Sequence, residues 1–197
     1  MRKTLLVITI LGVSLVSTAC INRFAVQELN NNAQQLMQSG NIDGAIARLE
    51  SSIDLDETVF ETHYNLAVAY IQAKKYDLAL KSLEKVKELK PDFAETYHSI
   101  AVANEEKAYE LINGKDEDNG SESSQEQSLQ QKELSESDKN SVCNYIAAAI
   151  DNYNTYLTKK SDASDKDKVN AEIERLNGEL KKYSENTAEQ EENGNIQ

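Results

Sequence analysis

Apolar residues recur three and four positions apart along much of this chain, which places them on one face of an α-helix. Around residue 70 they form two sets: Leu66, Ala67 and Tyr70, then Tyr76, Ala79, Leu83 and Val86. The segment between the two sets is polar and carries Lys74 and Lys75. The pattern predicts two helices of about fourteen residues joined by a tight turn.

The same pattern repeats with a period of 34 residues. Ala33, Ala67 and Ala101 have this spacing. Further pairs with the same spacing are Leu36 and Tyr70, Ile42 and Tyr76, Ala45 and Ala79, Leu49 and Leu83, and Leu55 and Leu89. Small residues suit positions where two helix axes approach closely, because a branched side chain would not fit there. The period therefore predicts stacked helical hairpins that cross at these alanines.

The stretch from Tyr64 to Pro91 resembles the tetratricopeptide repeat (TPR) family at nearly every preferred position. The first unit departs from the family pattern at Asn32, where Leu is usual, and at Glu57, where Pro is usual. Two units in register make the resemblance specific. It implies an all-α TPR solenoid of about three helix-turn-helix repeats.

The third repeat is predicted to be split by an insertion. Its first helix carries Tyr97, Ile100 and Ala101, but the second helical pattern reappears only at Ile146 and Ala149. The intervening residues are rich in Ser, Gln and Glu and poor in apolar side chains. Such a segment cannot bury enough surface to offset its chain entropy, so we expect a disordered acidic insert at the turn.

A final amphipathic pattern predicts a solvating helix that covers the last repeat. Its apolar positions are Val169, Ile173, Leu176, Leu180 and Tyr183. The predicted organisation is a signal peptide (1–19), repeats one, two and the first helix of three (20–112), the insert (113–138), the second helix of repeat three with the capping helix (139–184), and a disordered tail (185–197).

The first twenty residues have the pattern of an export signal. Arg2 and Lys3 precede a short apolar run, and small residues lead to Cys20. The run is shorter than the about 20 residues that span a bilayer. The segment resembles a bacterial lipoprotein signal, which implies a covalent lipid on Cys20. Ser17 stands where that pattern favours Leu, so ordinary cleavage to a soluble secreted protein is the alternative.

Charge and cysteine content narrow the set of partners. The chain has 34 acidic and 21 basic residues, and its formal net charge is −13. Such a chain repels nucleic acid and anionic headgroups, so we expect protein partners and a membrane attachment made by lipid alone. With Cys20 lipidated, Cys143 has no partner for a disulfide. It is either a reactive thiol or a small buried hydrophobe.

The sequence offers no catalytic constellation. The two histidines, His63 and His98, have no second ligand at metal-binding spacing, and no phosphate-binding loop is present. Paired carboxylates such as Glu105 and Glu106 are expected to lie on a solvated face. We therefore predict a protein that is not an enzyme and has no cofactor besides the covalent lipid.

The TPR resemblance implies a partner-binding groove on the concave side, made by the first helix of each repeat. By register its residues are Asn31, Gln34, Tyr64, Asn65, Val68, Ile71, His98 and Val102. Asn31 and Asn65 match an asparagine that some TPR proteins stack into a ligand-contacting ladder. The basic clamp of certain cytosolic TPR proteins is absent, because Asn30, Glu95 and Ser99 occupy its positions. Alternatively, Val68, Ile71 and Val102 only pack against neighbouring helices.

These observations predict a membrane-anchored TPR lipoprotein that faces the periplasm or cell exterior. Its expected role is that of a protein-interaction adaptor or assembly scaffold in the bacterial cell envelope. A self-associating structural module is the alternative.

Overall fold

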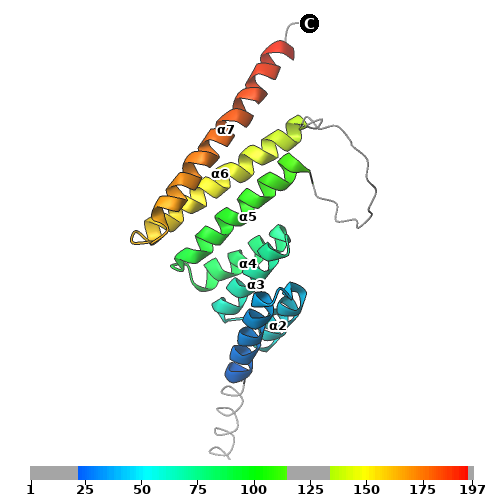
Figure 1. The fold of residues 1–197 in the computed structure, drawn as a ribbon, viewed down its shortest axis with the longest axis vertical. Coiled ribbons are helices and arrows are strands. Elements are labelled where there is room, and N and C mark those ends of the chain that lie inside the picture. The colour runs from blue at the N-terminus through cyan, green and yellow to red at the C-terminus, as the bar shows by residue number, and fades with distance from the viewer. Residues whose placement is uncertain (1–21, 115–133, 195–197) are drawn as a thin grey trace, which may run out of the picture. The chain divides into compact units, whose positions relative to one another are not determined.

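The computed structural model describes residues 22–114 and 134–194, with side chains up to Ser184. Every regular element in these ranges is an α-helix, which confirms the predicted all-α class (Figure 1). The chain divides into two compact units, Met1–Phe93 and Ala94–Gln197. Cys20 and the export signal lie outside the described residues, as does the central part of the insert. None of the described helices is long and apolar enough to cross a bilayer.

The first unit contains two regular helical hairpins. A helix over residues 22–38 is followed by α2 (Ile42–Leu55), α3 (Phe60–Gln72) and α4 (Tyr76–Leu89). The last three helices have 14, 13 and 14 residues, as the periodicity predicts. Ala33, Ala45, Ala67 and Ala79 are fully buried. The small residues therefore lie where the helices pack closely.

The two turns of the first unit are copies of each other. Gly40 and Lys74, which are one repeat apart, both adopt positive φ angles, +82° and +56°. In each turn the next residue donates its backbone N–H to a carbonyl five residues earlier, Asn41 to Leu36 and Lys75 to Tyr70, both at 2.8 Å. This pattern is a Schellman motif, which normally has glycine at the left-handed position. Lys74 adopts the same backbone conformation at a steric cost that Gly40 avoids.

The second unit is built from three longer helices. These are α5 (Ala94–Asn113), α6 (Glu136–Lys159) and α7 (Lys166–Gly194), and α6 lies between the other two (Figure 1). Ile146, Ala149, Tyr153 and Tyr156 of α6 share one core with Val169 and Leu176 of α7. The predicted capping face of the last helix packs on this core, with Ile173, Leu180 and Tyr183 at its edge.

The third repeat does not turn where the first two do. The position one period after Lys74 is Ala108, which lies inside α5 and is buried. Apolar residues continue beyond it, and Leu111 and Ile112 pack against the core that includes Val142. Because these side chains can still be buried, the helix continues and the hairpin is longer than a regular repeat.

The insert is consequently shorter than the predicted range 113–138. The helix α5 ends at Asn113, and α6 begins at Glu136, before the expected boundary at 139. The hydroxyl of Ser135 accepts the backbone N–H of Asp138 at 3.1 Å and donates to its carboxylate at 2.6 Å. Ser135 is therefore the N-cap of α6. This Ser-x-x-Asp cap is a sequence signal for the start of the helix.

The tail also departs from the predicted boundary. The polar composition predicts disorder over 185–197, whereas the backbone of α7 remains helical to Gly194. The segment contains no proline, and Ala, Glu and Gln are good helix formers. Residues 195–197 lie outside the described part.

Candidate interaction surfaces

In the first unit, the predicted groove residues come from two helices that share a side-chain hydrogen bond. The Nδ2 of Asn65 on α3 donates to the Oδ1 of Asn30 on the first helix at 3.1 Å. Gln34 lies one helical turn from Asn30 and is exposed. The faces of the two helices that carry Asn30 and Asn65 are therefore neighbours.

Three further acceptors hold Asn30. The two N–H groups of its Nδ2 are shared among the carbonyl of Val26 at 2.9 Å, the hydroxyl of Ser52 at 3.0 Å and that of Thr62 at 2.8 Å. Ser52 and Thr62 are fully buried. Asn30 thus ties the first helix to α2 and α3, a role that the sequence pattern does not reveal.

Asn31, the other predicted ladder residue, is exposed. It matches Asn65 in the 34-residue register, yet it is Asn30 that bonds to Asn65. Register identifies equivalent backbone positions, whereas contact between two helices depends on how they cross. The contact of Asn31 with a ligand stays a prediction.

The other three groove residues of this unit are half-buried. The ring of Tyr64 meets that of Phe93 edge to face at 5.0 Å, and Phe60 meets the same ring at 5.2 Å. Ile71 packs against the core of the first unit, as the packing alternative predicts for it. Val68 is half-buried on the same helix. All four predicted groove residues of α3 therefore keep partial exposure.

The two groove residues of the second unit take part in its core. The His98 ring lies edge to face against Tyr153 at 5.5 Å and Tyr156 at 5.1 Å. Burial lowers the pKa of His98, against the opposing effect of Asp165 and other nearby carboxylates. Val102 packs against the core as well. Both residues are half-buried, and their part in a groove stays a prediction.

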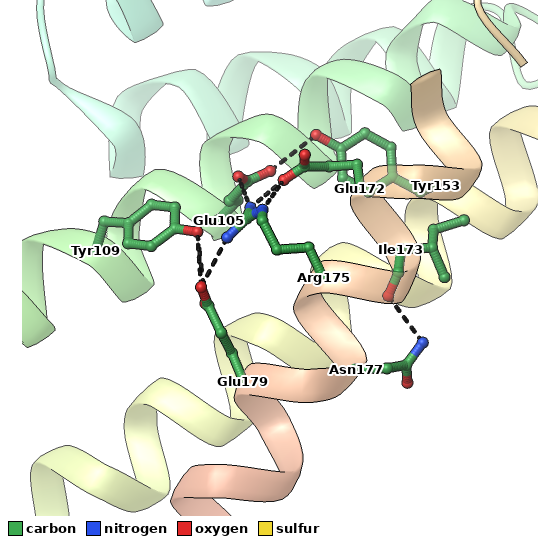
Figure 2. A network of polar contacts seen from close by, with 8 residues as sticks. All are labelled: Glu105, Tyr109, Tyr153, Glu172, Ile173, Arg175, Asn177 and Glu179. Carbon is green, nitrogen blue, oxygen red and sulfur yellow. Dashed lines mark hydrogen bonds and ion pairs between the residues drawn. The ribbon is translucent and has the colours of Figure 1, made fainter. Parts of the chain in front are cut away.

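The second unit also contains a polar network centred on Arg175 of α7 (Figure 2). Its guanidinium binds Glu105 of α5 at 2.5 Å and Glu179 at 2.8 Å, and it also binds Glu172. Tyr153 of α6 donates to Glu105 at 2.9 Å. The network joins all three helices of the unit. It also includes Tyr109, which donates to Glu179 at 3.2 Å.

The expectation that Glu105 lies on a solvated face is therefore wrong. Its side chain is 14% exposed. Burial, followed by a hydrogen bond with Glu172, raises its pKa to about 7, while Tyr153 and Arg175 act in the opposite direction. No local pattern marks this carboxylate, because its cationic partner is 70 residues away in the sequence.

Other features of the described residues add no reactive centre. Cys143 is half-buried, and burial raises its thiol pKa. A raised pKa favours a small hydrophobic packing residue over a reactive thiol. No group of three or more His, Cys, Asp or Glu side chains in the described ranges is arranged to hold a metal ion. A shallow hollow of about 450 Å³ lies beside the first helix, and it is lined by Leu29, Asn32, Gln35, Leu36, Ser39 and Arg48. None of these residues belongs to the predicted groove.

Three residues stand where certain TPR proteins have the cations of a basic clamp, and each of them has another role here. Asn30 is committed to the hydrogen bonds described above, Glu95 pairs with Lys160 at 2.6 Å, and Ser99 is buried. Lys160 lowers the pKa of the Glu95 carboxyl through this hydrogen bond.

The helical hairpins, their buried alanines and the covering last helix define a tetratricopeptide-repeat solenoid. The Tetratricopeptide repeat family model matches residues 36–102, so the chain contains TPR repeats. No protein of curated function matches the sequence significantly.

Solved structures share the fold at low sequence identity. The first TPR domain of human RPAP3 is 13% identical, with a TM-score of 0.56 over 80% of this chain and 95% of that one. A structure of the first TPR of Spaghetti (RPAP3) bound to the HSP90 peptide SRMEEVD is 14% identical, with a TM-score of 0.55 over 79% of this chain and 92% of that chain. The second TPR domain of human RPAP3, in complex with the HSP70 peptide SGPTIEEVD, is 12% identical, with a TM-score of 0.54 over 78% and 98%.

Proposed function

We propose that this chain is a lipid-anchored adaptor of the bacterial cell envelope that binds a protein segment on the first-unit surface carrying Asn65 and Tyr64. The observation that carries the proposal is the pairing of Asn65 with Asn30 beside the half-buried Tyr64. An amide offers both a donor and an acceptor to a ligand backbone. An aromatic ring with a polar tip is a residue type enriched at binding hot spots. Peptides bound to TPR domains in the structural neighbours support the same kind of partner.

A pull-down from detergent-solubilised envelopes tests the binding surface. The parent chain is compared with the double variant Tyr64→Ala/Asn65→Ala, and circular dichroism checks that both retain their helicity. We expect the double variant to lose the captured partner. Asn32→Ala is a matched control, because this amide lies on the first helix and donates to exposed Glu28 at 3.2 Å. Equal capture by the parent and the double variant would place binding on another surface.

The anchor rests on Cys20 and the export signal before it. Phe24, four residues further on, is 73% exposed on the first helix, where an aromatic ring would suit the membrane interface. Incorporation of labelled palmitate into the parent but not into Cys20→Ala is the expected result. Unlabelled parent protein in the soluble envelope fraction would favour ordinary secretory cleavage.

A further inference from the structure

The amide of Asn30 has one orientation that satisfies its neighbours. The backbone carbonyl of Val26 can only accept a hydrogen bond, so Nδ2 of Asn30 must face it. The hydroxyls of Ser52 and Thr62 accept on the same side. The Oδ1 of Asn30 is therefore left to face Asn65, where it accepts the Nδ2 hydrogen bond.

This arrangement fixes the orientation of Asn65 in turn. One N–H of Asn65 is taken by Asn30, and within the described part of the chain its Oδ1 accepts no hydrogen bond. In that part of the chain, Thr96 Oγ1 is the one side-chain polar atom that is both buried and without a hydrogen-bond partner. Because Asn65 Oδ1 has no partner either, it is not buried and is open to solvent. Asn65 thus offers an accessible acceptor whose direction is set by another residue.

The ionic side chains nearest this acceptor along its own two helices are acidic. Glu61 lies one helical turn before Asn65 and Glu28 lies two residues before Asn30, and both are exposed, whereas residues 29–42 and 62–73 contain no Asp, Glu, Lys or Arg. His63 is buried, and its Nε2 bonds to the Glu57 carbonyl at 2.8 Å. An anionic ligand group placed here would lose hydration, find no cation in these ranges and lie near Glu61.

We infer that Asn30 is a positioning residue for Asn65, and that this surface selects an uncharged, extended stretch within a partner chain rather than an acidic C-terminus. A backbone N–H of such a stretch supplies the donor that Asn65 Oδ1 requires. A free C-terminal carboxylate could accept only the second N–H of Asn65, could not serve Oδ1, and would find no cation in residues 29–42 or 62–73. The inference rests on the proposed function and names its ligand class. It also implies a ligand different from the acidic peptides that are bound to the structural neighbours.

Peptide selection on the full chain in detergent solution tests the ligand class. Benzoylphenylalanine replaces Gln34, which is exposed one turn from Asn30, and is crosslinked to a library of acetylated, amidated peptides of Gly, Ser, Asn, Gln, Val, Ile and Tyr. The best captured peptide is then compared with versions that carry a free carboxylate or an acidic pair. We expect each of these acidic versions to bind about tenfold more weakly, which corresponds to about 1.4 kcal/mol.

The outcomes of this selection separate the inference from the proposed function. Tighter binding of the acidic or free-carboxylate version would overturn the inference while peptide capture at Gln34 still supported an adaptor. Failure of every peptide to crosslink at Gln34 would count against both.

A double-mutant cycle tests the positioning role. Asn30→Ala should weaken binding of the best uncharged peptide about fivefold in the parent, but hardly at all in an Asn65→Ala background. A merely structural role would give the same loss in both backgrounds and would overturn the inference. Asn32→Ala again serves as the control on the same helix.

A second variant keeps the test informative if Asn30→Ala does not fold. Asn30→Asp retains an oxygen for the N–H of Asn65, and although its second oxygen faces the Val26 carbonyl and costs stability, the folded fraction should bind the peptide nearly as well as the parent. Binding by Asn30→Asp as weak as that of Asn65→Ala, with helicity preserved, would contradict the positioning role.

Discussion

The two units use the same repeat register for different chemistry. Asn30, Tyr64 and His98 are spaced by one period each. In the first unit the asparagine has four hydrogen-bond partners and the tyrosine packs on Phe93, whereas in the second unit the histidine packs between two tyrosines. The backbone repeat thus fixes where a side chain is placed, and the local neighbours decide what it does there.

The units also differ in what holds their helices together. The first unit combines buried alanines with an uncharged hydrogen-bonded cluster around Asn30. The second unit adds a charged network in which Arg175 joins three carboxylates. We therefore expect the stability of the second unit to depend on pH and on its cation. The stability of the first unit should depend on packing volume and turn geometry.

The largest expected effect is that of Arg175→Ala. It leaves the partly buried Glu105 beside Glu172 and Glu179 with no cation from the network, so we expect the second unit to lose about 2–4 kcal/mol of stability. Hydrogen exchange resolved by segment measures each unit separately. Arg48→Ala, at an exposed position on α2, should leave both units unchanged. Equal protection of α7 in the parent and Arg175→Ala would contradict a stabilising network.

Overpacking the first unit should have a smaller effect. Ala67→Leu places a larger side chain at a fully buried position and should cost about 1–3 kcal/mol in the unfolding of that unit. Ala47→Leu adds the same volume at an exposed position of α2 and should be neutral. Chemical denaturation monitored by segment distinguishes them, and a silent Ala67→Leu would show that the helices do not cross there.

The second unit should lose stability as the pH rises. The pKa of Glu105 is raised from 4.5 to about 7, so the folded state binds a proton that the unfolded state has released. This contribution is complete below about pH 4.5 and disappears by about pH 7. Glu105→Gln should remove this slope. An unchanged slope in the variant would assign the titration to another group.

The smallest expected effect concerns the paired turns of the first unit. Lys74→Gly relieves the positive φ angle and should stabilise the unit by about 0.5–1 kcal/mol, whereas Gly40→Ala should destabilise it by a similar amount. Nothing lies near the position that a Cβ would take at Gly40, so its loss would come from the backbone alone. If the two variants changed the free energy of unfolding in the same direction, the turns would not be equivalent.

The sequence by itself determined the features that depend on local pattern. The period of 34 places the buried alanines, and the spacing of Val169, Ile173 and Leu176 predicts the face of the covering helix. Even the end of the insert has a local signal in Ser135 and Asp138. These features follow from which residues share a helix face, and that is readable along the chain.

Only the tertiary structure decided the contacts between side chains distant in the sequence. It selects Asn30 rather than Asn31 as the partner of Asn65, and it buries Glu105 against Arg175. It also extends α5 through Ala108, because apolar residues beyond that point find a core on α6 and α7. The physical reason is that a crossing of two helices sets which side chains meet, and a shift of one residue around a helix turns a side chain by about 100°.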